Sequence, residues 1–151
     1  MRLILAAALA LGCVSAASAQ QDLSVDQSRL YVTDPAACPA LERKGVDAWM
    51  DMDFLALSFT DGIQGMEFHC NFYDVKGRSN GSALFVSAIC ELPGEIYPDI
   101  MSVSPYDETS IQVISSADMQ MEMSGMMETP EGEMPCATRY YRCDSLSELP
   151  R

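Results

Sequence analysis

The chain has 151 residues, among them six cysteines and eleven methionines, and its formal net charge at pH 7 is −13. Its length fits one domain of ordinary size, and its negative field repels nucleic acid and anionic lipid. We therefore expect no nucleic-acid partner, and a charged partner should be cationic: a basic protein, a polyamine or a metal ion. Acidity also keeps a protein soluble without any partner, and this simpler explanation stays open.

The first nineteen residues have the pattern of a bacterial export signal. Arg2 supplies the positive start, residues 3–14 form an apolar run, and residues 17–19 (Ala-Ser-Ala) are a cleavage site with small side chains. The apolar run is shorter than the roughly 20 residues that a membrane-spanning helix needs. We therefore predict that residues 1–19 are a signal peptide and that the protein works in the periplasm or outside the cell.

A rival interpretation of the signal concerns Cys13. This cysteine follows Ala10-Leu11-Gly12, which resembles a lipoprotein box with its leucine displaced from the usual position. A lipid on Cys13 would anchor the protein to a membrane, whereas in the simpler interpretation Cys13 is only an apolar residue of a discarded peptide. No later stretch reaches membrane-spanning length, so the sequence predicts no transmembrane segment.

Five cysteines follow the signal, and an odd number cannot all pair within one chain. No CxxC motif is present, which argues against zinc, thiol-redox and c-type haem sites. An oxidising compartment favours two structural disulfides and one spare thiol. Cys136, in a polar segment beside a proline, is the best candidate for the spare thiol. The disulfide candidates, with three connectivities open, are Cys38, Cys70, Cys90 and Cys143.

The N-terminal part of the mature chain is predicted to contain little regular structure. Residues 20–32 read as a polar, loosely ordered lead-in. Thr33-Asp34-Pro35 is a helix-start signal, and the following helical element should be short or broken because Pro39 lies deep within it. We expect it to end at Gly45, with a further helical turn or a loop over residues 47–53.

From residue 54 the apolar pattern changes to the period of two that is typical of strands. Residues 54–60 and 63–75 form a predicted hairpin around Asp61-Gly62, and residues 83–92 form a strand that is apolar on both faces, ended by Pro93-Gly94 and Pro98. Further strands are predicted at residues 100–104, 111–115 and 137–143. The sequence thus predicts a mainly β fold: a single domain over residues 33–151, built as a small antiparallel sheet or partly closed barrel with a short N-terminal helix and two disulfides.

The segment from residue 118 to residue 135 holds six methionines, including Met134. Thioethers are soft donors that suit Cu(I), and a free thiol nearby would add a soft ligand. Two packing alternatives stay open, an alternating strand and an amphipathic helix, and in both the methionines are core residues. The candidate copper ligands are Met119, Met121, Met123, Met126, Met127 and Cys136.

Catalytic motifs are lacking. His69 is the only histidine, so a Ser-His-Asp or Cys-His arrangement would have to use it, with Cys136 as the conceivable nucleophile. Neither HExxH nor a G-x-S-x-G elbow is present. We therefore assign no catalytic residue and expect that the protein is not an enzyme.

Residues 65–72 and 83–92 resemble the cysteine-bearing strands of small periplasmic β-domains, of which the membrane-anchored inhibitors of animal-type lysozyme are one group. The resemblance is architectural and matches no motif residue by residue, so no site is carried over from it. Together with the acidity it suggests a small exported, non-catalytic binding or envelope-associated protein with a cationic partner, for example an inhibitor of a basic hydrolase. The alternative is periplasmic copper binding through residues 119–134.

Overall fold

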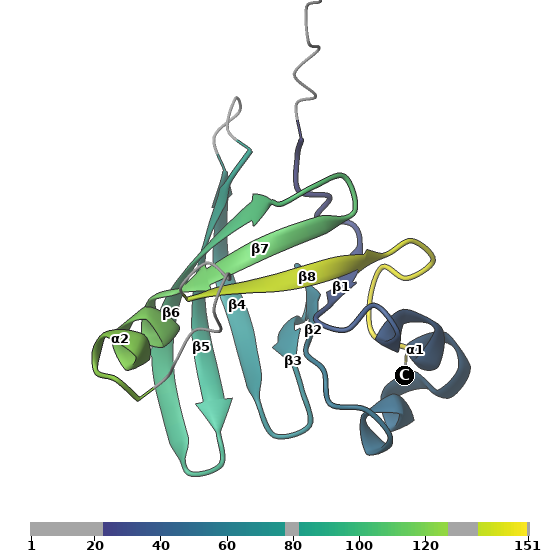
Figure 1. Ribbon diagram of the computed structural model, residues 1–151, viewed down its shortest axis with the longest axis horizontal. Coiled ribbons are helices and arrows are strands. Elements are labelled where there is room, and N and C mark those ends of the chain that lie inside the picture. Colours follow the sequence, from purple (N-terminus) through teal and green to yellow (C-terminus); the bar gives the residue numbers. More distant parts are fainter. Residues whose placement is uncertain (1–22, 78–81, 127–135, 151) are drawn as a thin grey trace, which may run out of the picture.

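Eight antiparallel strands close into a barrel in a computed structural model of the chain, in which residues 23–77, 82–126 and 136–150 are described (Figure 1). Each strand pairs with the next one along the chain, and the last pairs with the first. The strands are β1 (Leu30–Val32), β2 (Ala56–Ser58), β3 (Gly62–Gln64), β4 (His69–Gly77), β5 (Leu84–Leu92), β6 (Glu95–Pro105), β7 (Ser110–Ser115) and β8 (Ala137–Cys143). The predicted mainly β architecture is confirmed. The predicted signal, Cys13, Met127 and Met134 lie outside the described residues.

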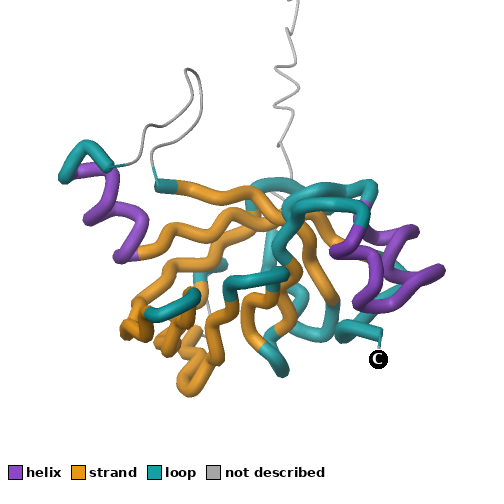
Figure 2. The backbone as a smooth tube through the Cα atoms, turned by 90° about the horizontal axis from the view of Figure 1, so that it is seen from below, coloured by secondary structure: helices purple, strands orange, loops and turns teal. Residues whose placement is uncertain are grey.

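The described residues form three helical segments outside the barrel: α1 (Ala37–Lys44), the 3-10 helix η1 (Gly45–Met50) and α2 (Ser116–Met123). The α1–η1 pair follows β1, and α2 lies between β7 and β8 in the chain. Figures 1 and 2 show that α1–η1 and α2 lie on opposite sides of the barrel. Residues near one helical region are therefore distant from those near the other.

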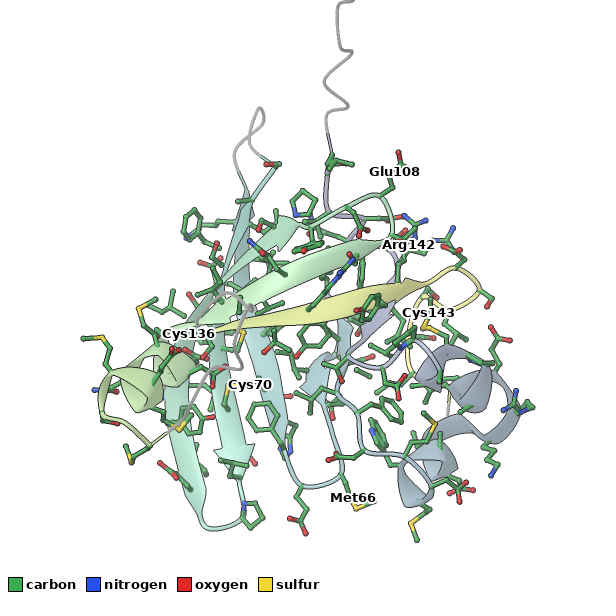
Figure 3. The ribbon with its side chains drawn as sticks, viewed as in Figure 1. Met66, Cys70, Glu108, Cys136, Arg142 and Cys143 are labelled. Carbon is green, nitrogen blue, oxygen red and sulfur yellow. A yellow bond between two sulfur atoms is a disulfide. The ribbon has the colours of Figure 1, made fainter. Side chains whose placement is uncertain are left out.

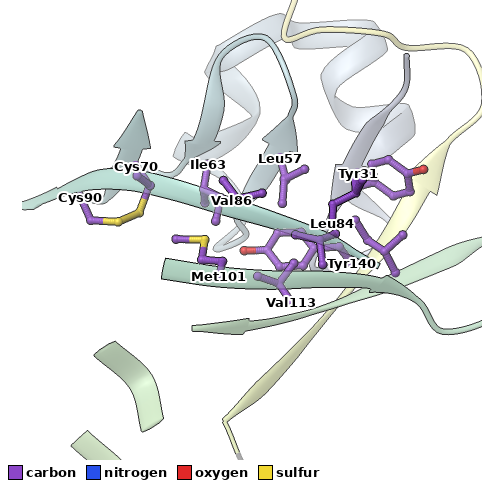
Figure 4. Close-up of a cluster of buried hydrophobic side chains, with 13 residues drawn as sticks. Tyr31, Leu57, Ile63, Cys70, Leu84, Val86, Cys90, Met101, Val113 and Tyr140 are labelled. Carbon is purple, nitrogen blue, oxygen red and sulfur yellow. A yellow bond between two sulfur atoms is a disulfide. The ribbon is translucent and has the colours of Figure 1, made fainter. Parts of the chain in front are cut away.

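The barrel interior is filled with side chains from all eight strands (Figure 4). Successive strand residues point to opposite faces, so one residue in two faces inward. Leu84, Val86, Ala88 and Cys90 of β5 show this alternation, and each is at most 8% exposed. Fully burying a leucine or valine side chain contributes about 1.5–3 kcal/mol, so this interior is the main source of stability.

A second core lies outside the barrel, between α1 and the outer face of β1, β2 and β8. Leu30 and Val32 face this core, while Tyr31 between them points into the barrel. Leu41 of α1 is fully buried against them, and the disulfide between Cys38 and Cys143 joins the helix to the end of β8. α1 is thus fixed to the barrel wall covalently as well as by packing. The segment 30–32, which the sequence placed in the lead-in, is strand β1.

The strand predicted over residues 63–75 is instead two strands, β3 and β4. A turn separates them, in which the Gly65 amide donates a hydrogen bond to the Phe68 carbonyl at 2.7 Å. A Cβ at position 65 would lie 2.7 Å from Leu55 Cδ2, so the turn packs closely against the segment before β2. Gly62 has a φ of +81°, and a Cβ there would lie 1.9 Å from the Cys70 carbonyl oxygen, which explains why glycine stands in this tight turn.

The predicted break at Pro98 is also wrong, since β6 runs through it from Glu95 to Pro105. Pro98 is opposite Ile89 of β5, and β7 pairs with β6 only from Met101 onward. At Pro98, β6 therefore has no partner strand on the β7 side, and the missing N–H of the proline breaks no ladder hydrogen bond there. A proline is tolerated in a strand at such an edge position.

Candidate functional site

The methionine-rich segment begins as a helix, since α2 covers its first residues. The Ser115 hydroxyl caps α2 by accepting a hydrogen bond from the Asp118 amide at 3.1 Å, and the buried Asp99 carboxylate accepts hydrogen bonds from Ser116 Oγ at 2.6 Å and the Ala117 amide at 3.1 Å. The strand alternative is therefore wrong for residues 119–123.

The helical alternative is right in secondary structure but wrong in packing. Met119, Met123 and Met126 are 44%, 84% and 76% exposed, so they are not core residues. Met121 is half-buried and, with Met126, lines a mainly apolar groove of about 700 Å³ between α2 and the β5–β6 hairpin. The methionines of α2 thus face solvent or this groove.

Among the described residues Cys136 is the free thiol, as predicted, and it lies beside α2. Its Sγ donates a hydrogen bond to Glu122 Oε2 at 2.7 Å. The hydrogen bond to this carboxylate is the largest cause, and partial burial the next, of a rise in the pKa of the thiol to about 11. The thiol is therefore protonated at neutral pH, which opposes a role as a nucleophile.

His69 does not join Cys136 in a catalytic pair. Its Nε2 lies 3.0 Å from Glu91 Oε2 on the neighbouring strand β5, so its partner is neither a nucleophile nor the Glu67 that lies near it in sequence. In the described part of the chain, no cluster of three or more His, Cys, Asp or Glu side chains is arranged to hold a metal ion.

Basic side chains of the described residues are largely neutralised by local carboxylates. Lys44 lies against Asp51, and Arg139 against Asp107. The remaining ion pairs of Lys and Arg join Arg29 to Asp26, Lys76 to Asp74 and Arg142 to Asp144. Because acids outnumber bases, exposed carboxylates are left over without a cationic partner in the described part.

Two of these carboxylates, Asp53 and Glu67, lie on a surface groove of about 610 Å³, called here the methionine–acid groove. One wall is the end of η1 and the segment that leads to β2, and the other is the β3–β4 turn. Figure 3 shows Met66 of this turn at the lower edge of the barrel, away from Cys136. The groove is lined by Trp49, Met50, Asp51, Met52, Asp53, Leu55, Met66, Glu67 and Phe68.

The first wall is held in shape by Trp49. Its indole Nε1 donates a hydrogen bond to the Phe54 carbonyl at 2.9 Å, and its ring stacks on the buried Phe54 ring with centroids 5.3 Å apart. The Asp51 and Met52 amides both donate to the Ala48 carbonyl, at 3.1 and 3.2 Å. Residues 50–53 therefore form a tight loop, which hydrogen bonds to Ala48 hold at its start and the Trp49–Phe54 contact holds at its end.

The groove combines apolar surface with unpaired negative charge. Met50 and Met66 are 79% and 61% exposed, and Asp53 and Glu67 are exposed with no ion pair or hydrogen bond in the described part. Methionine side chains adapt their shape to a bound group, and a tryptophan ring attracts a cation. The arrangement suits an aliphatic chain that ends in a positive charge, the chemistry of lysine and arginine side chains.

Sequence reasoning missed this groove, although part of its signal was visible. Residues 49–53 alternate methionine with aspartate after a tryptophan, which is unusual for a connecting loop. Nothing in the local pattern brings Met66 and Glu67 beside them, because the sequence placed both in a continuous strand.

Comparison with known proteins finds no match to any protein-family model, curated protein or solved structure. The described helices include none with the length and apolar character required to cross a bilayer. The two disulfides indicate an oxidising compartment, extracellular or periplasmic.

Proposed function

We propose that this is an exported, non-catalytic binding protein that uses the methionine–acid groove to bind a cationic protein partner. The observation that carries the proposal is the position of Asp53 and Glu67, two exposed carboxylates without a cationic partner in the described part, beside the exposed side chains of Met50 and Met66. A basic hydrolase that the protein inhibits is the concrete form of this partner.

Lysine and arginine side chains of a partner would meet complementary chemistry at two levels. Over long range, the net charge of −13 steers a basic protein towards the surface. At contact, the methylene chain of the inserted residue lies on Met50, Met66 and Trp49, while its cation faces the two carboxylates. The apolar contact would hold the complex after the charges have brought the partners together.

Two features support an extracytoplasmic setting for this function. The disulfides fit an oxidising compartment, and the first nineteen residues have the composition of an export signal. Basic hydrolases that attack the cell envelope act in the same compartment as an exported inhibitor.

The test is binding to a basic hydrolase, with an animal-type lysozyme as the probe, measured by calorimetry at low and high salt. The double variant Asp53→Asn/Glu67→Gln should weaken binding at low salt by at least about tenfold, or 1.4 kcal/mol. The matched control, Glu95→Gln/Glu148→Gln, removes the same charge from exposed carboxylates outside the groove and should weaken binding only slightly. No binding at low salt, or equal losses in both variants, would refute the groove as the site.

Copper binding by the methionine segment is a second candidate, favoured by the solvent exposure of Met119, Met123 and Met126 and by Cys136 beside the same helix. Competition titration with Cu(I) should then show tighter binding at higher pH, because the protonated thiol must lose its proton to ligate. Changing Met119, Met121, Met123, Met126 and Met127 together to Leu should abolish this affinity, and an unchanged affinity would exclude the copper function.

A further inference from the structure

The outer face of β4, β5 and β6 carries a second surface, distinct from the methionine–acid groove. Residues that alternate with the barrel core point outward here, and five of them are large and exposed. Four are 61–71% exposed and one is 38% exposed. This apolar face consists of Tyr73, Phe85, Ile89, Ile96 and Ile100.

The strand register makes the apolar face continuous. Ile89 is opposite Pro98, which places it diagonally between Ile96 and Ile100 of β6. Phe85 is opposite Ser102, which places it diagonal to Ile100. Diagonal neighbours on adjacent strands are within reach of long side chains, so these four residues form one patch. Tyr73 lies at the bulge of β4, next to Asp74, whose partner on β5 is Ser87.

The charged and titratable side chains described on this face lie in two neighbouring pairs. His69 Nε2 lies 3.0 Å from Glu91 Oε2, and Lys76 Nζ lies 2.8 Å from Asp74 Oδ2. The Lys76–Asp74 pair has no net charge, so the face carries at most the single negative charge of Glu91, against the two carboxylates of the groove that are unpaired in the described part. In a chain of net charge −13, it is a place where two copies can approach while opposing few carboxylates.

The size of the apolar face fits a weak but specific interface. At about 100 Å² of exposed surface for each large side chain, the five residues present about 500 Å². Two such faces would bury about 1,000 Å², the lower bound for a specific protein interface, before flanking residues are counted. A patch of about this area is at the upper end of what monomeric proteins expose.

We propose that the apolar face binds a second copy of this chain, forming a dimer through the β4–β6 walls of two barrels. The face is apolar and carries little net charge, so the same patch on both copies can meet across a two-fold axis. Packing of two sheets face to face is a common way to cover such a surface. The methionine–acid groove of each copy remains open, since its walls belong to η1, the segment before β2 and the β3–β4 turn.

The test is analytical ultracentrifugation of the purified protein over a range of concentrations and salt. The wild type should form a reversible dimer that tightens as salt rises, because screening weakens the repulsion between two acidic copies. Ile100→Asp and Phe85→Asp, both outward-facing, should each weaken the dimer at least about tenfold. The control Val46→Asp adds the same charge at an exposed residue of η1 and should leave the dimer intact.

All measurements are repeated with Cys136→Ser, so that an intermolecular disulfide is not mistaken for the dimer. A wild type that stays monomeric at every concentration and salt would overturn the proposal, even if another apolar partner or a lipid vesicle then bound the face. A dimer that survives both face substitutions, or that disappears with Cys136→Ser, would overturn it as well.

Discussion

The chemistry of Cys136 is set by a neighbouring carboxylate. The Glu122 carboxylate accepts its thiol hydrogen at 2.7 Å and is the largest cause of a thiol pKa of about 11, above the ordinary value of 9.0. Because the shift is upward, the thiolate is scarce at neutral pH and becomes abundant only as the pH rises through about 11. A cysteine in an oxidising compartment is thereby kept from forming unwanted disulfides.

Replacing the carboxylate should make the thiol more reactive. In Glu122→Gln the thiol pKa falls towards its ordinary value, so the thiolate fraction at pH 8 rises. Since a less basic thiolate is also less nucleophilic, we expect alkylation by iodoacetamide to accelerate by about tenfold rather than by the full change in thiolate fraction. The reaction is followed by intact mass against pH.

Glu95→Gln is the control for this experiment, since Glu95 is an exposed carboxylate that does not contribute to the Cys136 shift. Its alkylation rate should equal that of the wild type. If Glu122→Gln also reacts at the wild-type rate, the hydrogen bond does not govern the thiol.

At the scale of elements, α1 depends on the barrel wall more than on its own sequence. It spans only eight residues, contains Pro39 and has no side-chain cap. An isolated helix of this length is marginal, so the buried contact of Leu41 and the bond from Cys38 to Cys143 hold it in place.

Removing that disulfide should therefore release α1 before it unfolds the barrel. The bond spans a sequence separation of 105 residues, and closing a loop of this length contributes about 4–5 kcal/mol in the chain-entropy model. In Cys38→Ala/Cys143→Ala we expect a loss of up to this size in the free energy of unfolding, with faster hydrogen exchange at α1 amides.

The second disulfide provides the matched comparison. Cys70 and Cys90 are opposite one another inside the barrel, with a separation of 20 residues, so Cys70→Ala/Cys90→Ala should lower stability without selectively exposing α1. Equal α1 protection in the two double variants would show that packing alone holds the helix.

Elements were predictable where the pattern is local. The strands at residues 83–92 and 137–143 were found nearly to the residue, because alternation there is uninterrupted. The break between β3 and β4 was missed because it depends on Gly65 meeting Leu55, a contact between two segments. Strand β1 was missed because three residues carry too little pattern, and only pairing with β2 and β8 defines it.

The candidate groove shows the same limit at the scale of the whole molecule. The number of disulfides and the spare thiol followed from composition and compartment, but the sequence left their pairing open. The groove requires residues 49–53 to meet residues 66–68, and the folding of β2 and β3 as a hairpin brings them together. An acidic, methionine-containing loop was visible in the sequence, whereas its second wall exists only once the chain has folded.

The charge of the whole molecule should make its stability depend on salt. The five Lys or Arg ion pairs of the described part involve side chains that are mostly well exposed, and such pairs contribute little. Repulsion among the remaining carboxylates is then the larger electrostatic effect, and salt screens it with a Debye length of about 10 Å at 0.1 M. We expect the free energy of unfolding in urea at neutral pH to rise by on the order of 1 kcal/mol between about 0.01 M and 0.5 M NaCl.

The groove variant sharpens this measurement. Asp53→Asn/Glu67→Gln removes two carboxylates that have no cationic partner in the described part, so it should be more stable than the wild type at low salt and should gain less when salt is added. Lys76→Met provides the opposite case, because it leaves Asp74 without its partner at 2.8 Å and increases the repulsion. A wild type that loses stability as salt rises would mean that the ion pairs outweigh the repulsion. If the groove variant is then no more stable than the wild type at low salt, the unpaired Asp53 and Glu67 impose no cost on the folded protein.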